Sequence, residues 1–147
     1  MREAGVLWLQ MTGGEPLIDN GFRNSYALAW DLGMMIQISS NGSRLSDPRV
    51  LELLTTRRSY RITLPVYGAT EESYDTTTKR RGAFVRFLKG LQAGTEAGLP
   101  LELNQAQPLR RRARGRLEEL VPRAVCLPPR HRGMPQRPAV AAPWTRA

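Results

Sequence analysis

The 147-residue chain has very few of the residues that hold metals or form disulfides: one cysteine, Cys126, and one histidine, His131. A single cysteine excludes an internal disulfide framework and any multi-cysteine metal site built by this chain alone. Cys126 and His131 together supply two of the four ligands that a tetrahedral metal site needs. The only histidine lies near the carboxyl end, so no Ser/His/Asp set is available for nucleophilic catalysis. We therefore predict no metal ligands and no catalytic residues in this chain.

Long apolar runs are also missing. No stretch of about 18 apolar residues occurs, so no segment is predicted to span a membrane. The first residues lack a basic region followed by an apolar stretch and a small-residue cleavage site, so secretion is not indicated. A cytoplasmic location without membrane attachment is the default expectation.

Net positive charge is nearly absent over most of the chain and is concentrated at its end. The formal net charge is +9, yet residues 1–104 carry 12 basic and 11 acidic side chains. Residues 105–147 carry 10 basic and 2 acidic side chains, together with 7 of the 11 prolines. A basic footprint of this kind belongs to a tail and does not indicate a basic nucleic-acid-binding domain. We predict one folded domain over residues 1–104 and a disordered Arg/Pro-rich tail over residues 105–147.

The pattern of apolar residues in the first 104 positions alternates between strands and helices. Four apolar runs predict strands, at 6–12, 34–39, 60–67 and 99–104. The first run is nearly continuous, which is typical of a strand covered on both faces. Helical spacing of apolar residues predicts helices at 22–33, 48–54 and 84–91. This alternation predicts an α/β fold with a parallel sheet, in which ligands bind beyond the carboxyl ends of the strands.

The loop after the first predicted strand carries the clearest candidate site. Gly13 and Gly14 remove both Cβ atoms where the backbone turns, which allows the main chain to approach a ligand. Glu15 adds an anion that accepts hydrogen bonds and suits an ammonium group, and Pro16 stiffens the exit. An ordinary strand-to-helix turn is the alternative interpretation of this loop.

This loop, the strand before it, the turn Ser40-Asn41-Gly42 and the segment Val66-Tyr67-Gly68-Ala69-Thr70 resemble the radical S-adenosylmethionine enzymes. The resemblance runs from about Gly5 to Asn104 and is greatest to the peptide- and protein-modifying branch that often carries an extra cluster-binding C-terminal domain. It implies an incomplete parallel (β/α) barrel with about four of the family's six strand–helix units. It also implies S-adenosylmethionine and a [4Fe–4S] cluster as cofactors, and a peptide or protein substrate.

The resemblance also implies which residues bind the cofactor. Gly13, Gly14, Glu15 and Pro16 would hold the methionine amino group, and Ser40 and Asn41 would lie near the same pocket. The family activity is the reductive cleavage of S-adenosylmethionine at the cluster, which starts radical modification of the substrate.

The chain departs from the family pattern in its cysteines. The family holds its cluster with three cysteines in a CxxxCxxC loop that precedes the Gly-Gly-Glu-Pro segment. Only 11 residues precede Thr12 here, and Cys126 lies alone on the other side of the motif. Because three thiolates hold the cluster that donates the electron, we expect a truncated core domain that is inactive alone.

Two further departures concern the strand ends. Ser40 stands where the family commonly has threonine, which keeps the hydroxyl. Pro65 stands where relatives usually have a serine thought to contact the cofactor ribose. Proline loses that hydroxyl and also removes a donor from a strand that is predicted to be central. We interpret this change as a relaxed constraint or a lowered affinity for the cofactor.

Three accounts of the tail remain open: a shifted reading frame in GC-rich coding DNA, an unselected disordered extension, and a functional basic arm. The third account gives the alternative function, a non-enzymatic protein that binds nucleic acid or an acidic partner through its arginines. No aromatic residues are interleaved with the arginine run at 110–116, so nucleic acid is not the favoured partner.

Overall fold

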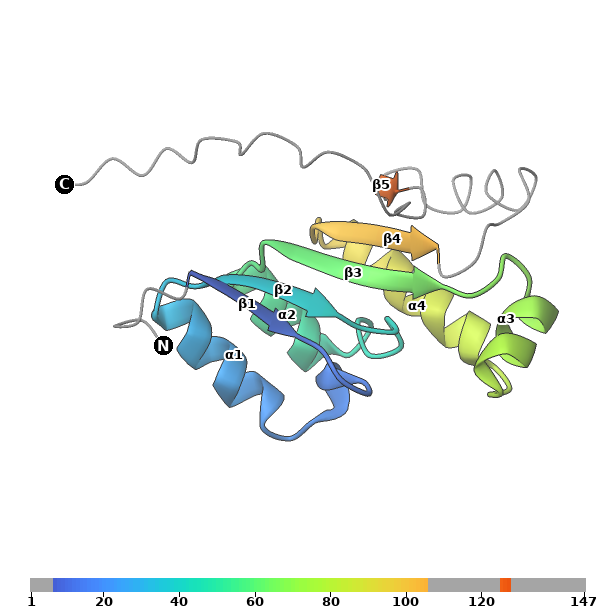
Figure 1. Ribbon diagram of the computed structural model, residues 1–147, viewed down its shortest axis with the longest axis horizontal. Helices are drawn as coiled ribbons and strands as arrows, with labels where there is room; N and C mark the ends of the chain where they lie inside the picture. Colours follow the sequence, from blue (N-terminus) through green and yellow to red (C-terminus); the bar gives the residue numbers. More distant parts are fainter. Residues whose placement is uncertain (1–6, 106–124, 128–147) are drawn as a thin grey trace.

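The computed structural model describes residues 7–105 and 125–127, with side chains described for residues 7–104. Five parallel strands form one sheet in the order of the chain, β1-β2-β3-β4-β5 (Figure 1). The strands are β1 (Trp8–Met11), β2 (Met35–Ser39), β3 (Arg61–Val66), β4 (Leu101–Gln105) and β5 (Val125–Leu127). The helices are α1 (Phe22–Asp31), α2 (Pro48–Thr56), α3 (Glu71–Thr78) and α4 (Ala83–Glu96), with a short 3-10 helix, η1 (Pro16–Ile18). The predicted α/β fold, a partial parallel (β/α) barrel, is confirmed.

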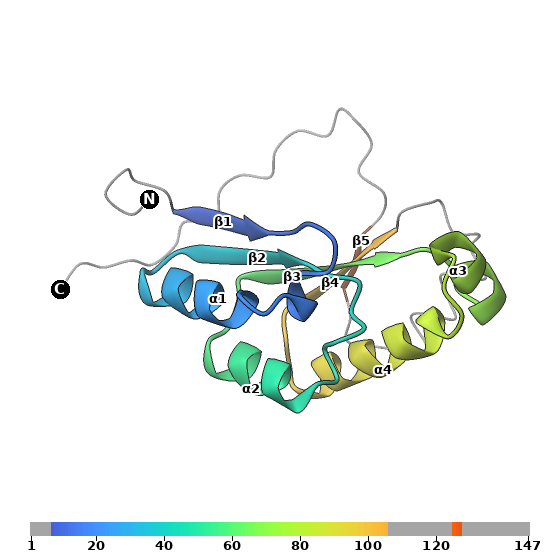
Figure 2. The ribbon, with the colours of Figure 1, turned by 90° about the horizontal axis from the view of Figure 1, so that it is seen from below.

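Helices α1, α2 and α4 lie on one face of the sheet (Figure 2). Burial alternates along β2 and β3, and the buried residues of these strands are apolar: Ile36, Ile38, Ile62, Leu64 and Val66. The residues between them are only half-buried and mostly polar. Parallel strands with one apolar and one polar face are what the wall of a barrel requires, since its inner face lines the ligand site.

The first strand differs from its prediction in one respect. Leu9 and Met11 pack against the core, whereas Trp8 and Gln10 are exposed, so β1 is not covered on both faces. The sequence concealed this alternation because tryptophan, although apolar, occupies an open position.

The helix starts follow local chemistry. Asp47 caps α2 by accepting a hydrogen bond from the backbone N–H of Arg49 (3.0 Å), and Pro48 stands in the first turn. Phe84, Phe87 and Leu91, which recur at helical spacing, lie on the buried face of α4.

Negative charge at residues 71, 72 and 75 favours a helix start, and the structure has a separate short helix there. The acidic residues Glu71 and Glu72 lie in the first turn of α3, a separate short helix that Thr70 caps. Asp75 lies within α3 and accepts hydrogen bonds from the backbone N–H groups of Gly82 (2.5 Å) and Phe84 (3.0 Å) at the start of α4. These hydrogen bonds hold the pKa of Asp75 below its ordinary value, with the Phe84 bond as the largest cause. The carboxylate therefore fixes the loop between α3 and α4.

The predicted boundary at residue 104 meets an additional strand. The backbone of β5 pairs in parallel with β4, with Cys126 opposite Leu103. This short strand falls inside the segment predicted to be a disordered tail. The rest of that tail, including His131 and the arginine run of the alternative basic arm, lies outside the described residues.

Among the residues that the structure describes, no helix combines the length and the apolar character needed to cross a membrane.

Candidate functional site at the carboxyl ends of the strands

The loop that follows β1 depends on glycine for its backbone conformation. Gly13 has φ +103° and Gly14 has φ +53°, values that residues with a Cβ rarely adopt. A Cβ added at either position would meet nothing within 4 Å, so the glycines are required for the turn and not for close packing. Both residues are exposed, and their main chain is open to a ligand.

Glu15 joins this loop to the end of β2. Its Oε1 accepts hydrogen bonds from the hydroxyl of Ser40 (2.7 Å) and from the backbone N–H of Leu17 (3.2 Å). Its Oε2 accepts a hydrogen bond from the backbone N–H of Asn41 (2.6 Å). A carboxylate offers about four acceptor positions, so these three bonds leave Glu15 roughly one position for a ligand donor. Pro16 is buried directly after it, at the start of η1.

Ser40 and Asn41 support the site through their own turn. The Ser40 side chain is buried, with 2% of the residue exposed, and its Oγ also accepts a hydrogen bond from the N–H of Gly42 (3.0 Å). The Asn41 Oδ1 accepts a hydrogen bond from the N–H of Ser43 (2.9 Å). Both side chains are therefore engaged within the protein, and we interpret Ser40 as a residue that positions Glu15.

All six predicted site residues thus meet at the carboxyl ends of β1 and β2. Four of them, Gly13, Gly14, Glu15 and Asn41, line an open hollow of about 550 Å³. Ligand sites commonly have volumes of about 300–1,000 Å³, so this hollow is large enough for a nucleoside-sized molecule.

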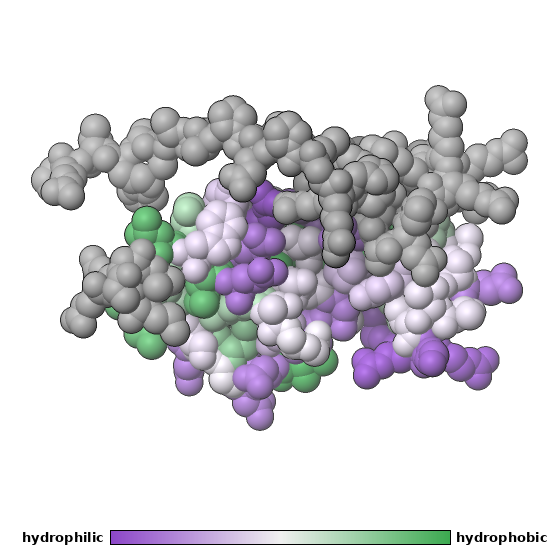
Figure 3. All heavy atoms as spheres, in the orientation of Figure 1, coloured by the Kyte–Doolittle hydropathy of each residue, from purple (hydrophilic) through white to green (hydrophobic). Residues whose placement is uncertain are grey.

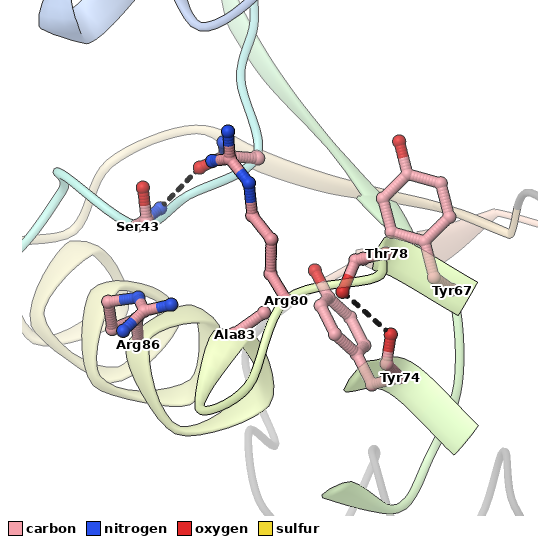
Figure 4. A pocket seen from close by; sticks show the side chains of 8 residues that line it. Ser43, Tyr67, Tyr74, Thr78, Arg80, Ala83 and Arg86 are labelled. Carbon is pink, nitrogen blue, oxygen red and sulfur yellow. Dashed lines mark hydrogen bonds between the residues drawn. The ribbon is translucent and has the colours of Figure 1, made fainter. Parts of the chain in front are cut away.

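The hollow also contains a residue that the sequence did not indicate as part of a site, Arg80. Two adjacent arginines in a polar segment are normally solvated charge, but Arg80 lines this hollow and an adjoining smaller one of about 70 Å³. Its side chain extends from the loop between α3 and α4 toward the segment that carries Ser43 (Figure 4). None of the ion pairs among the described residues involves Arg80.

The position of Arg80 follows from the loop that Asp75 fixes. Lys79 ends α3 in the left-handed conformation, with φ 55°, and the chain reverses there. The Asp75 carboxylate binds the N–H groups of Gly82 and Phe84. These bonds fix the loop between α3 and α4, which carries Arg80. A long-range contact of this kind leaves no signal in the local sequence.

Pro65 lies in β3, between β2 and β4 in the sheet, and its effect on the sheet is smaller than predicted. The N–H of Ile62 donates to β4, at the carbonyl of Pro100 (2.9 Å), whereas the carbonyl of Thr63 accepts from Ser40 on the β2 side (3.1 Å). Successive residues of a strand point in opposite directions, so the missing N–H of Pro65 would point toward β2. The β2–β3 pairing ends at Ser39 and Thr63, so the proline stands at the end of that ladder and interrupts no bond within it.

A metal site has no support among the described residues, where no group of three His, Cys, Asp or Glu side chains converges.

Comparisons with known proteins give this geometry a context. No protein-family model matches the chain. The AdoMet-dependent heme synthase of Methanosarcina barkeri is 29% identical over 96 residues, which make up 65% of this chain and 27% of that protein. The PqqA peptide cyclase of Rhizobium meliloti is 27% identical over 125 residues, or 85% of this chain and 32% of that protein.

Solved structures with a similar fold come from another protein. Streptococcus suis SuiB bound to S-adenosylmethionine superimposes with a TM-score of 0.67 over 81% of this chain and 28% of that chain, at 18% identity. The SuiB structure with the precursor peptide SuiA gives the same score and covers 27% of that chain. These sequence relatives and structural neighbours are radical S-adenosylmethionine enzymes, and the chain is similar to a fragment of their core domain.

Members of the radical S-adenosylmethionine family use S-adenosylmethionine and a [4Fe–4S] cluster. The chain spans about a third or less of the length of the family members that it matches.

Proposed function

We propose that this chain is part of a radical S-adenosylmethionine core domain and that its strand-end hollow binds the amino acid end of S-adenosylmethionine. The supporting observation is that the carboxylate of Glu15 and the guanidinium of Arg80 line the same hollow. A second carboxylate, that of Asp19, also lines it, and its Oδ1 accepts a hydrogen bond from the N–H of Gly21 (2.7 Å). An α-amino acid carries an ammonium and a carboxylate on one carbon, so it needs an anionic and a cationic partner at short range. Gly13 and Gly14 supply exposed main chain beside both.

The roles follow from the chemistry of each group. Glu15 would accept a hydrogen bond from the ammonium at its remaining acceptor position. Arg80 would donate to the carboxylate, a pairing for which the planar guanidinium is well suited. Ser40 and the N–H of Asn41 would hold the Glu15 carboxylate in place through the bonds of 2.7 and 2.6 Å. Bound S-adenosylmethionine supplies a reactive sulfonium; the residues named here bind and orient it.

The cluster does not fit the residues present. Three thiolates are needed to hold it, and the chain contains one cysteine, Cys126, whose strand β5 lies next to β4 at the other end of the sheet from β1. We propose that the 147-residue chain binds the cofactor without cleaving it. Anaerobic treatment with iron, sulfide and a strong reductant should give no stoichiometric [4Fe–4S] absorption and no 5′-deoxyadenosine. Formation of both would overturn this part of the proposal.

A peptide or protein is the proposed substrate class of the whole enzyme from which this core segment derives. The longer of the two sequence matches is to a peptide cyclase, and the matching fold is that of a protein crystallised with its precursor peptide.

Titration calorimetry with three compounds tests the amino acid clamp. S-Adenosylmethionine and S-adenosylhomocysteine share the amino acid end, whereas 5′-methylthioadenosine keeps the nucleoside and lacks it. The first two should bind measurably more tightly than the third. Arg80→Gln should weaken binding of the first two by about tenfold, the effect of losing one solvent-exposed charged hydrogen-bond pair, and leave 5′-methylthioadenosine unchanged.

Arg81→Gln is the matched control, because it removes the same charge from the neighbouring residue, which does not line the hollow. Equal weakening by both substitutions would indicate a general effect of charge and contradict the clamp. Equal affinity for all three compounds would contradict it as well.

A further inference from the structure

Arg80 lies in a short loop between α3 and α4 whose charged side chains are exposed. Lys79, Arg80 and Arg81 are all exposed, and hydrophilic side chains gather on the side of the molecule where α3 and the start of α4 lie (Figure 3). Lys79 (φ 55°) and Gly82 (φ 69°) are in the left-handed conformation, so the backbone turns sharply on both sides of the two arginines. Because exposed side chains contribute little packing, the course of this loop depends on its hydrogen bonds.

Asp75 accepts hydrogen bonds from both ends of the loop. Its carbonyl oxygen accepts from the backbone N–H of Arg80 (3.1 Å). Its carboxylate accepts from the N–H groups of Gly82 (2.5 Å) and Phe84 (3.0 Å). The carbonyl of Arg80 in turn accepts from the N–H of Ala83 (3.3 Å). The main chain of Arg80 is therefore fixed on both of its sides, and Asp75 supplies three of the four acceptor contacts.

The Asp75 carboxylate does not itself face a ligand. Asp75 is absent from the residues that line the hollow of about 550 Å³ and the adjoining one of about 70 Å³. The hydrogen bond from Phe84 is the largest cause that lowers its pKa, and the charge of Arg86 on α4 acts in the same direction. The carboxylate is thus an anion at neutral pH, bound at the first turn of α4. Any effect of Asp75 on a ligand must pass through another residue.

We infer that Asp75 is a positioning residue for ligand binding: it holds Arg80 at the hollow and thereby raises the affinity for the amino acid end of S-adenosylmethionine. This inference rests on the proposed clamp by Glu15 and Arg80. An arginine side chain has several rotatable bonds, and ordering it on binding costs free energy. A loop that Asp75 has already fixed limits the positions that the guanidinium can take, which lowers this cost.

The packing of α3 against α4 does not require the Asp75 side chain. Tyr74 is buried, with 2% of the residue exposed, and its ring centroid lies 5.1 Å from that of Phe87 and 5.6 Å from that of Phe84. These aromatic contacts hold the two helices together when the carboxylate is removed. We therefore expect Asp75→Ala to fold with a loosened loop, and circular dichroism checks that it has folded.

Titration calorimetry on the 147-residue chain tests the role of Asp75 with S-adenosylmethionine, S-adenosylhomocysteine and 5′-methylthioadenosine. Asp75→Ala should weaken binding of the first two by about three- to tenfold, and by no more than Arg80→Gln does. Binding of 5′-methylthioadenosine, which lacks the amino acid end, should not change. Asp75→Asn keeps one carbonyl oxygen as an acceptor, so its affinities should lie between those of the wild type and Asp75→Ala. A general structural role would weaken the binding of all three compounds alike.

Glu72→Ala is the matched control. It removes the same charge from the same helix, because Glu72 lies in the first turn of α3. Glu72 lines neither hollow and takes part in none of the ion pairs among the described residues. This substitution should leave the affinities for all three compounds unchanged, and a loss equal to that of Asp75→Ala would overturn the inference.

A double substitution separates this inference from the proposed clamp. If Asp75 acts through Arg80, Asp75→Ala should cause no further loss of affinity in an Arg80→Gln background. Additive losses would overturn the inference. So would an Asp75→Ala protein that binds like the wild type although Arg80→Gln weakens binding, or one that loses affinity for all three compounds equally. If Arg80→Gln alone changes nothing, the clamp itself is wrong and the inference falls with it.

Discussion

Replacing Gly90 with alanine tests how the site loop is held against the sheet. Gly90 lies in the middle of α4, where alanine would normally stabilise a helix by about 1 kcal/mol. A Cβ at this position would lie 1.9 Å from the carbonyl oxygen of Gly42, a backbone atom in the turn that carries Ser40 and Asn41. Separations below 3.0 Å essentially never occur for Cβ atoms, so the turn or the helix must move by about 1 Å.

The loss in the free energy of unfolding follows from the contacts that such a movement disturbs. Overpacking a well-packed site costs about 1–3 kcal/mol. The turn also contributes the N–H of Asn41 that donates to the Glu15 carboxylate at 2.6 Å, and a hydrogen bond to a charged group contributes about 1.5–3 kcal/mol. Subtracting the gain in helix propensity, we expect Gly90→Ala to lower the free energy of unfolding by about 1.5–5 kcal/mol.

Gly94→Ala, one turn further along α4, is the control. Its Cβ would meet the Cδ1 of Leu101 at 3.1 Å, a flexible side-chain end that can shift by a few tenths of an ångström. We expect its free energy of unfolding to change by less than about 1 kcal/mol. Urea denaturation followed by circular dichroism measures both. If Gly90→Ala is as stable as Gly94→Ala, the close approach of α4 to the site turn is wrong.

Two further substitutions test polar contacts. The pKa of Asp75 is held below its ordinary value, so this carboxylate stabilises the fold above the ordinary carboxyl pKa, and that stability is lost as the pH falls below about 4. Asp75→Asn should therefore lower the melting temperature at pH 7 and make it fall less steeply in acid. A parallel fall of the melting temperature in both proteins would argue against this role. Burial raises the pKa of Tyr26 to about 12, so its hydroxyl stays protonated and donates to the carbonyl of Arg57 at 2.6 Å. Tyr26→Phe should lower the free energy of unfolding by about 1 kcal/mol, measured by urea denaturation at pH 7. An unchanged free energy of unfolding would show that this hydrogen bond contributes nothing.

Local patterns in the sequence predict most of the sheet and its helices because they reflect local chemistry. The Asp47-Pro48 cap and the apolar spacing of Phe84, Phe87 and Leu91 indicate α2 and α4 without reference to any distant residue. The acidic residues of α3 indicate a helix start, but its extent as a separate helix was not predicted, because it buries one apolar residue, Tyr74, and most of its other residues are polar. A helix of that composition has no apolar face for a pattern to detect.

The candidate site was predictable in part for the same reason. Gly13, Gly14 and Glu15 are contiguous, and the positive φ angles of the glycines depend on local sterics. The hydrogen bond between Glu15 and Ser40 joins residues 25 positions apart. Only the resemblance to a known family indicated that these two segments lie close together. Arg80 lies 65 positions after Glu15 in a loop whose course depends on Asp75, so neither composition nor periodicity could place it.

Pro65 shows how a departure from the family pattern can alter the site and leave the fold intact. The proline lies beyond the last paired residues of β2 and β3, so the sheet loses no ladder bond there. Its side chain lies on the half-buried face of β3 together with those of Arg61 and Thr63, and it can offer no hydroxyl to a ligand. This face of β3 therefore has no side-chain hydroxyl at residue 65, whereas Glu15 and Arg80 line the hollow. If the proposed clamp is correct, binding energy in this chain is concentrated at the amino acid end of the cofactor, and contacts to its ribose contribute less.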